Sequence, residues 1–267
     1  MCGIVGYTGS DIAKNILVTG LKRMEYRGYD SSGVALEVGE GAAAHLDVIR
    51  RVGKVAGLES ELSNIDSDAT CGIGHTRWAT HGKPSVVNAH PHTSCDGRIA
   101  IVHNGIIENY GPLKADLMAK GVTFESETDT EVLVKLIDYF CCAQPKQSPL
   151  AALREALAMV RGSYALAVLF KDYPDTIFAV KRESPLIVGW GEGENFVASD
   201  IPALLKYTRT VYYIDNLEIA RLTPDSIEFF NIDKEPITRE STTIEWDAEA
   251  AEKGGYEHFM LKEIMEQ

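Results

Sequence analysis

The stretch SYALAVLFKDYPDTIFAVKRESPLIVGWGEGENFVASD (163–200) decides the fold of this chain. Its short apolar runs are rich in β-branched and aromatic residues and are separated by turn residues, a pattern typical of strands. The pattern continues through residues 210–232, and only ALLKY (203–207) interrupts it as a predicted helix. Strands that follow one another without a helix between each pair favour largely antiparallel sheets with helices packed outside them. The sequence therefore predicts an α+β fold.

The segments before residue 163 supply most of the predicted helices. RIAIVHNG (98–105) is a strand-like run that gives way to a helical segment broken by Pro112. The best helix start is Ser148 followed by Pro149, since serine caps a helix and proline suits its first position. Segments with apolar residues at helical spacing are 11–24, 128–142 and 148–162. We expect these helices to cover the sheets.

Composition and charge exclude several classes of protein. The 267 residues carry a net charge of -13, so without a basic patch we expect no affinity for nucleic acid or an anionic membrane. No stretch approaches the roughly 18 apolar residues that a membrane span needs, and the N-terminus does not resemble an export signal. Five cysteines, an odd number, argue against a disulfide framework. We therefore expect a cytoplasmic location.

A group of histidines first suggests a metal site. Five of the seven fall in one short region: His75, His81, His90, His92 and His103. Pro91 separates the closest two, and neither a nearby carboxylate nor a Cys-x-x-Cys pair completes a ligand set. Histidines hydrogen-bonded in a polar cleft are the simpler interpretation, so we expect no metal.

The same region, GHTRWATHGKPSVVNAHPH (74–92), is a candidate substrate anchor. Its centre holds Arg77, Trp78, Thr80 and His81 beside small residues. Arginine can grip a carboxylate through two parallel hydrogen bonds, so Arg77 suits a small acidic substrate. Alternatively, Arg77 is in a surface ion pair and Trp78 is in the core.

Two further motifs have a chemical and a structural interpretation. Asn104 and Gly105 end an apolar strand, where a carboxamide N–H beside a backbone N–H could form an oxyanion hole. An ordinary Asn-Gly turn is the alternative. Asp129, in SETDTE (126–131), could cap the start of a helix or bind a substrate ammonium group.

Cys2, in MCGIVGYTGS (1–10), is a candidate nucleophile because of its position in the chain. If Met1 is removed, Cys2 has a free α-amine; the pKa of such a group is about 7.7–8.0, so a substantial fraction is neutral and can accept a proton at pH 7. A terminal cysteine thus carries a nucleophile and a base in one residue. The alternative is a small buried residue near a strand end.

Taken in order, these fragments resemble the glutamine amidotransferase domain of the glutamine:fructose-6-phosphate aminotransferase family. The resemblance spans nearly the whole chain. It runs through MCGIVGY, EYRGYDSSG, GHTRWATHGKPS, NAHPH, VHNGIIEN, SETDTE, RGSYALAV and NFVASD. The family belongs to the N-terminal-nucleophile hydrolases, and the resemblance implies a four-layer αββα sandwich.

The resemblance also implies a role for each matching residue. Cys2 would attack the side-chain amide of L-glutamine, and the Asn104 side chain and Gly105 N–H would hold the oxyanion. Arg77 would pair with the substrate α-carboxylate and Asp129 with its α-ammonium. The remaining family positions are Trp78, Thr80 and His81 in the adjoining loop, and Arg27 and His90 as supporting residues.

The resemblance further implies a division of the chain and a destination for the ammonia. Residues 1–240 would form the amidotransferase domain, and residues 241–267 would begin a linker to a sugar-isomerase domain absent here. In the full-length enzyme, expected to be a homodimer, ammonia would pass to fructose 6-phosphate to make glucosamine 6-phosphate, without a cofactor. Two alternatives stay open: another ammonia acceptor, or a silent glutamine-binding module if Met1 is retained.

Overall fold

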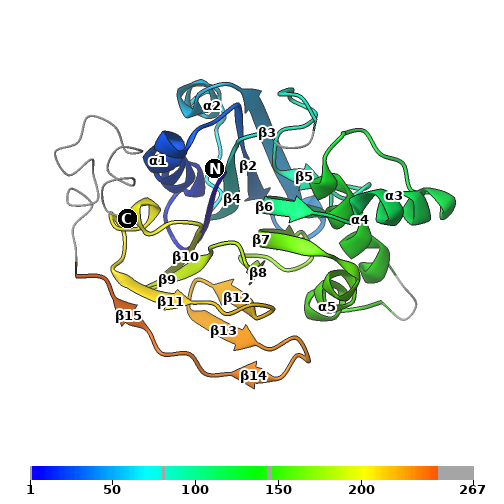
Figure 1. The fold of residues 1–267 in the computed structure, drawn as a ribbon. Helices are drawn as coiled ribbons and strands as arrows, with labels where there is room; N and C mark the ends of the chain where they lie inside the picture. The colour runs from blue at the N-terminus through cyan, green and yellow to red at the C-terminus, as the bar shows by residue number, and fades with distance from the viewer. Residues whose placement is uncertain (1, 80–81, 143–145, 246–267) are drawn as a thin grey trace, which may run out of the picture.

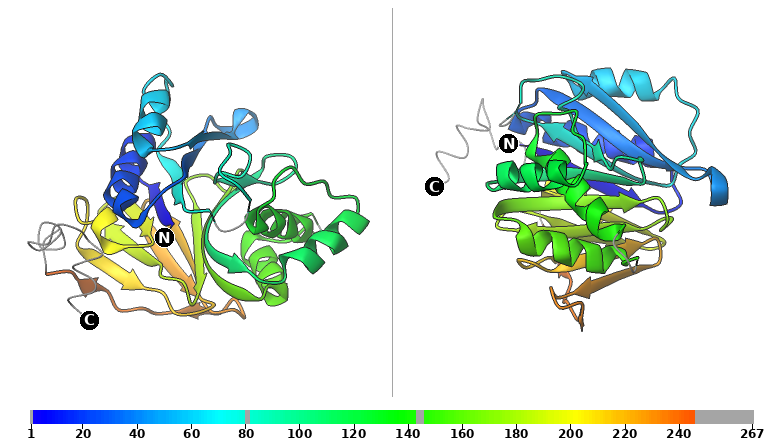
Figure 2. Two further views of the ribbon diagram at one scale, coloured as in Figure 1. Left: turned by 45° about the horizontal axis from the view of Figure 1, so that its top comes forward. Right: turned by 90° about the vertical axis from the view of Figure 1, so that its right-hand side faces the viewer.

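The computed structural model describes residues 2–79, 82–142 and 146–245. Two β-sheets lie face to face, and helices cover the outer side of each sheet (Figures 1 and 2). Within the described ranges, no helix is long and apolar enough to cross a membrane.

The first sheet has eight strands, and the N-terminal strand lies inside it, between two neighbours. Its strand pairs are antiparallel. In spatial order the strands are β15 (Thr242–Thr243), β11 (Thr210–Tyr213), β9 (Ile187–Gly191), β10 (Glu194–Ala198), β1 (Gly3–Thr8), β4 (Cys71–Arg77), β2 (Ser31–Val38) and β3 (His45–Val52). The sheet therefore continues past residue 240, the expected end of the domain.

The second sheet has seven strands and is also antiparallel. In spatial order these are β14 (Pro236–Ile237), β13 (Ser226–Phe230), β12 (Ile219–Thr223), β8 (Ile177–Arg182), β7 (Gly162–Phe170), β6 (Ile99–Ile107) and β5 (His92–Thr93). The run SYALAVLF forms most of β7, which pairs with β6 on one side and β8 on the other.

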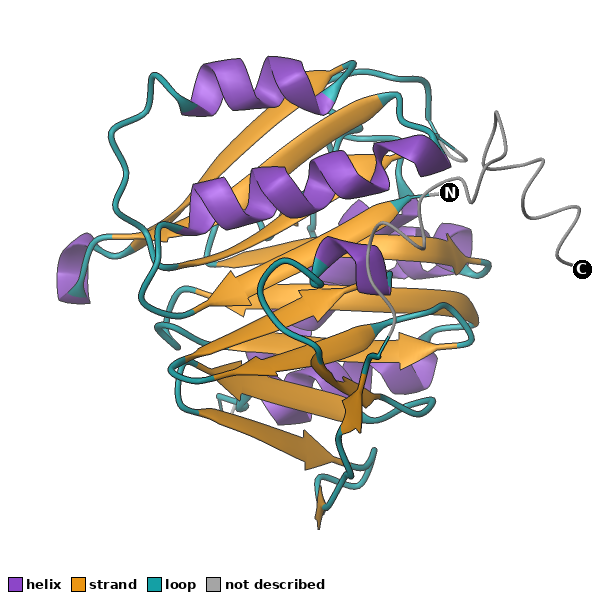
Figure 3. Ribbon diagram, turned by 90° about the vertical axis from the view of Figure 1, so that its left-hand side faces the viewer, coloured by secondary structure: helices purple, strands orange, loops and turns teal. Residues whose placement is uncertain are grey.

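In the described part of the chain, five α-helices form the two outer layers (Figures 2 and 3). Helices α1 and α2 pack on the first sheet, and α3, α4 and α5 pack on the second. Their bounds are α1 (Ala13–Met24), α2 (Val55–Leu62), α3 (Tyr110–Ala119), α4 (Asp129–Cys141) and α5 (Pro149–Met159). The predicted four-layer αββα sandwich of antiparallel sheets is confirmed.

Side-chain size explains how the layers pack. Along β7, Leu166 and Val168 point toward the helices, whereas Ala165 and Ala167 point toward the other sheet. This alternation follows from the two-residue period of a strand. Small side chains at the inner face let the two sheets approach closely, and each large side chain buried under the helices contributes about 1.5–3 kcal/mol.

Three local predictions can be compared with the structure. Ser148 caps α5 as predicted: its hydroxyl accepts a hydrogen bond from the Ala151 N–H at 3.3 Å. The predicted helix at ALLKY is wrong, because a short 3-10 turn at Ile201–Ala203 is followed only by turns. The predicted break at Pro112 is also wrong, since this proline lies in the first turn of α3, where a missing N–H costs no intrahelical bond.

Candidate active site

The candidate residues meet at one end of the layer between the two sheets. Ile4 of β1 and Ile73 of β4 belong to the apolar cluster in this layer. Strand residues alternate between the two faces of a sheet, so residues two apart share a face. Cys2, two residues before Ile4, and His75, two residues after Ile73, therefore lie on the face that is turned toward the second sheet. Asn104 reaches this end from β6, so the fold joins segments about 100 residues apart in sequence.

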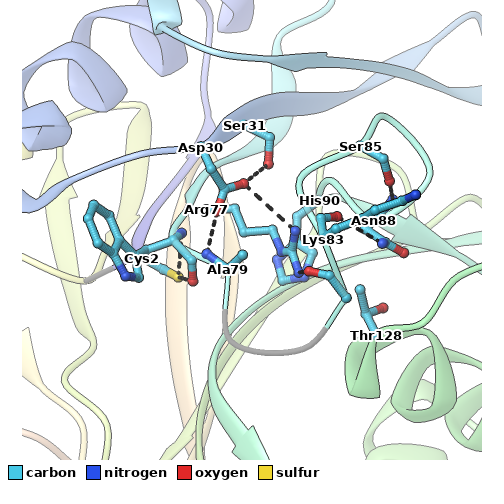
Figure 4. A network of polar contacts seen from close by, with 12 residues as sticks. Cys2, Asp30, Ser31, Arg77, Ala79, Lys83, Ser85, Asn88, His90 and Thr128 are labelled. Atoms are coloured by element: carbon cyan, nitrogen blue, oxygen red, sulfur yellow. Dashed lines mark hydrogen bonds and ion pairs between the residues drawn. The ribbon is translucent and has the colours of Figure 1, made fainter.

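The Cys2 thiol lies against the backbone of Trp78 (Figure 4). The Trp78 N–H donates to Cys2 Sγ at 3.2 Å, and Sγ is 3.5 Å from the Trp78 carbonyl oxygen. Burial raises the pKa of the thiol and outweighs the Trp78 N–H and the nearby positive charges, which lower it. The thiol is therefore protonated at neutral pH, and attack by the sulfur requires a base.

Asn104 connects the cysteine to a buried histidine. Its Nδ2 donates to the carbonyl oxygen of Cys2 at 3.2 Å, and its Oδ1 is 3.0 Å from Nε2 of His75. The amide group has two N–H bonds, so one remains available beside the cysteine for a further acceptor. This arrangement suits the predicted oxyanion hole.

Gly105 occupies a backbone position that only glycine fits. Its φ is 120°, and a Cβ atom there would lie 2.1 Å from the carbonyl oxygen of Ser163. The left-handed conformation turns the chain directly after Asn104. An Asn-Gly pair in the middle of a nine-residue strand is not the two-residue hairpin turn that was the alternative.

Arg77 is buried and paired, rather than part of a surface ion pair. It is only 4% exposed; its Nη1 is 3.7 Å from Asp30 Oδ1, and its Nη2 donates to the Gly82 carbonyl oxygen at 3.0 Å. The Asp30 carboxylate also accepts hydrogen bonds from the Ala79 N–H and, at 2.8 Å, from the Ser31 hydroxyl (Figure 4). Asp30 thus joins the arginine to the segment that touches Cys2.

Trp78 is not in the core, because its side chain is 55% exposed. The indole ring lies over Gly28, where a Cβ atom would be 2.3 Å from Trp78 Cε3. The absence of a side chain at Gly28 therefore makes room for the indole. The loop EYRGYDSSG contributes both this glycine and Asp30 to the site.

Asn88 ties the loop after Arg77 to the start of α4. Its Nδ2 donates to the Lys83 carbonyl oxygen at 3.0 Å and to the Glu127 carboxylate at 3.1 Å, and its Oδ1 accepts from the Glu127 N–H at 3.0 Å. Figure 4 shows this contact between Asn88 and Lys83 beside Arg77. The loop and the helix start are therefore held together on the same side of the site.

Asp129 is the first residue of α4 but does not cap it. The cap is Thr128, whose hydroxyl accepts from the Glu131 N–H at 3.3 Å. The Asp129 carboxylate instead accepts from the N–H of Ile107 at 2.8 Å, two residues beyond Gly105, and it is 4% exposed. A carboxylate turned away from its own helix can serve as a substrate contact.

Four of the five clustered histidines are brought together and buried: His75, His90, His92 and His103. Burial lowers the pKa of His75 and His92 to about 3 and that of His90 well below its usual value, so these rings are neutral. His92 and His103 contact the hydroxyls of Thr128 and Thr130 at 3.0 and 2.9 Å. Within the described ranges, no three His, Cys, Asp or Glu side chains are arranged to hold a metal ion.

Three predicted residues cannot be placed in this network. Thr80 and His81 lie outside the described residues, as does the side chain of Arg27, whose backbone ends the 3-10 segment Glu25–Arg27. Sequence reasoning missed Asp30 and Asn88. Both lie in motifs that carry the family resemblance, EYRGYDSSG and NAHPH. A single carboxylate or amide in a loop does not indicate which distant residue it will contact.

Two solved structures have a similar fold. The glutamine phosphoribosylpyrophosphate amidotransferase of B. subtilis has a TM-score of 0.73 and 23% identity, covering 88% of this chain and 50% of that one. A structure of the allosteric regulatory enzyme of purine biosynthesis has the same TM-score and 24% identity, covering 86% and 49%. The chain therefore has the αββα fold of the N-terminal-nucleophile hydrolases, as these two structures do.

Sequence similarity then identifies the family. Residues 75–206 match the model of a glutamine amidotransferase domain. Glutamine–fructose-6-phosphate aminotransferases (isomerizing) of Caldanaerobacter subterraneus subsp. tengcongensis and Thermus thermophilus are 53% and 51% identical over this entire chain. The chain spans 43% of the length of each relative. This chain belongs to the glutamine amidotransferase domain family and corresponds to the glutaminase part of these aminotransferases.

Proposed function

We propose that this chain hydrolyses the side-chain amide of L-glutamine to glutamate and ammonia through a thioester on Cys2. The observation that carries the proposal is the 3.2 Å contact between Asn104 Nδ2 and the backbone of Cys2. It brings an amide donor from β6 beside the candidate nucleophile, and an oxyanion hole requires such a donor.

The reaction begins with a proton transfer. Removal of Met1 frees the α-amine of Cys2, which accepts the thiol proton while the sulfur bonds to the amide carbon of glutamine. The carbonyl electron pair moves to oxygen, and the Asn104 amide and the Gly105 N–H stabilise the resulting charge. The C–N bond then breaks, the nitrogen takes up the proton and leaves as ammonia. Water hydrolyses the thioester, which releases glutamate and restores the thiol.

The two ends of the substrate require opposite charges. Glutamine is zwitterionic at its α-carbon, so Arg77 binds the carboxylate and Asp129 the ammonium group. Trp78, Thr80 and His81 follow Arg77 closely in sequence, and we assign them to the binding of the same substrate. We assign supporting roles to His90 and Arg27. No step calls for a cofactor.

The direct test measures the glutamate that the protein releases from glutamine, after its intact mass has shown that Met1 is lost. We expect release by this protein and none by Cys2→Ala, which keeps the fold. Protein with a verified Cys2 terminus that releases no glutamate would contradict the proposal. If intact mass shows that Met1 is retained and isothermal calorimetry still detects glutamine binding, the silent binding module is the better description.

In the longer protein, we infer that the ammonia passes to fructose 6-phosphate, giving glucosamine 6-phosphate, and that residues after 240 lead toward the sugar-binding part. The high identity to aminotransferases supports this acceptor over a phosphoribosyl one. Full-length protein should form glucosamine 6-phosphate from glutamine and fructose 6-phosphate. Sedimentation of the same protein tests the expected homodimer, and cell fractionation tests the expected cytoplasmic location.

A further inference from the structure

The orientation of the Asn104 amide is determined by its two neighbours. A carbonyl oxygen can only accept a hydrogen bond, so the atom of Asn104 that lies 3.2 Å from Cys2 O must be the NH2 group. The oxygen of the amide therefore faces Nε2 of His75 at 3.0 Å. Since this oxygen can only accept, His75 must carry its proton on Nε2.

The next ring in the cluster fixes the same tautomer. Nδ1 of His90 lies 3.3 Å from the same Nε2 of His75, and both rings are buried. Two N–H groups cannot face each other at this distance, so His90 Nδ1 carries no proton and its proton is on Nε2. A positively charged ring would carry a proton on both nitrogens. In His90 the added proton on Nδ1 would face the Nε2–H of His75, and in either ring the charge would be buried without a counter-charge.

We propose that His75 is a positioning residue, whose Nε2–H holds the Asn104 amide with its NH2 group toward Cys2. The inference rests on the proposed function, because it assigns the NH2 group to the oxyanion. Without the His75 donor, rotation of the amide by half a turn would place its oxygen where the oxyanion forms. Two partial negative charges would then face each other, and the donor would be lost.

The kinetic test compares two substitutions of one residue. His75→Leu removes the donor, and we expect kcat for glutamate release to fall by about 10²- to 10³-fold, as when one oxyanion donor is lost. KM should change by less than about threefold, because the α-carboxylate and α-ammonium contacts are kept. His75→Gln restores an N–H near the position of Nε2, and it should recover about tenfold or more of the lost rate.

His92→Leu is the matched control, since it removes a buried histidine of the same cluster that does not contact Asn104. It should lower the unfolding midpoint as much as His75→Leu while keeping kcat within about threefold of the unsubstituted chain. Equal kcat values for His75→Leu and the unsubstituted chain would overturn the inference. A folded His75→Gln that is as slow as His75→Leu would also count against it.

A second measurement does not depend on activity or on a variant that folds. The ¹⁵N shifts of the imidazoles in the unsubstituted chain report which nitrogen of each ring is protonated. We expect neutral Nε2–H tautomers for both His75 and His90; an Nδ1–H tautomer at His75 would overturn the inference. Failure of the proposed function is distinct, because then the unsubstituted chain with a free Cys2 terminus would itself release no glutamate.

Discussion

Replacing Glu131 by glutamine tests how the start of α4 is held. The Glu131 carboxylate accepts hydrogen bonds from the N–H groups of Glu125 and Ser126 at 2.9 and 2.6 Å, and from the Ser126 hydroxyl at 2.6 Å. It also forms an ion pair with Lys135 at 2.6 Å, and each side chain is only 6% exposed. The same turn of helix carries Asp129, so this network supports a candidate substrate contact.

The size of the effect follows from the pKa of Glu131. Burial raises this pKa, but the hydrogen bonds from Lys135, Ser126 and Glu125 outweigh burial and lower it from 4.5 to about 2. The difference corresponds to about 3 kcal/mol of folding free energy at neutral pH. Because the pKa is lower in the folded state, this contribution is complete above about pH 5 and falls as the pH drops toward 2, with about 1 kcal/mol left at pH 3.

Glu131→Gln removes the charge and leaves Lys135 buried without its partner, so we expect a loss of about 3–5 kcal/mol at pH 7. Urea unfolding at pH 7 and pH 3, followed by circular dichroism, measures the difference between the two chains. This difference should shrink by about 2 kcal/mol at pH 3, since the variant lacks the titrating group.

The control is Glu59→Gln, which breaks the exposed ion pair of Glu59 with Lys22 and should cost less than about 1 kcal/mol at both pH values. A Glu131→Gln difference that is the same at pH 7 and pH 3 would refute the assigned pKa and the network behind it.

Four further predictions concern the site and one turn. Gly28→Ala places a Cβ 2.3 Å from Trp78 at a φ of 96°, so urea unfolding should show a loss of about 1–3 kcal/mol. Arg77→Lys cannot form two parallel hydrogen bonds, so kcat/KM for glutamine should fall by roughly 10- to 100-fold in a glutamate-release assay. The kcat/KM profile should rise with pH through the pKa of the Cys2 α-amine, about 7.7–8.0 for a chain terminus in water, because the amine accepts a proton only when neutral; a flat profile from pH 6 to 9 would argue against this base. Lys234 is exposed and has a φ of 68°, so Lys234→Gly should raise the free energy of unfolding by up to about 1 kcal/mol, and a loss of stability would contradict this.

The fold could be predicted from the sequence because its signals are local. Short apolar runs in series indicated antiparallel sheets, and the cap at Ser148 marked the start of α5. The helix predicted at ALLKY is wrong because a run of five residues is too short to show the repeating apolar pattern that distinguishes a helix from a turn. Pro112 misled because the effect of a proline depends on whether it lies in the first turn or in the interior of a helix, which composition does not reveal.

The site was harder to predict because its contacts join distant segments. Residue types suggested what Cys2 and Arg77 can do, and the family resemblance assigned roles to them. Nothing local indicated that Asp30 would meet Arg77, or that Asn104 would lie between Cys2 and His75. These partners depend on the order of the strands, since β1, β4 and β6 become neighbours in space only after both sheets form.

The neutrality of the buried histidines fits the charge that the substrate brings. Glutamine presents one positive and one negative group, which Asp129 and Arg77 can balance. A charged histidine beside Asn104 would add a further positive charge to the site. This charge would lower the pKa of a nearby α-ammonium and of the thiol. Burial keeps the pKa of His75 at about 3, so the ring supplies a hydrogen bond without a charge. The inner layer therefore continues from apolar side chains into the neutral polar side chains of Asn104 and His75.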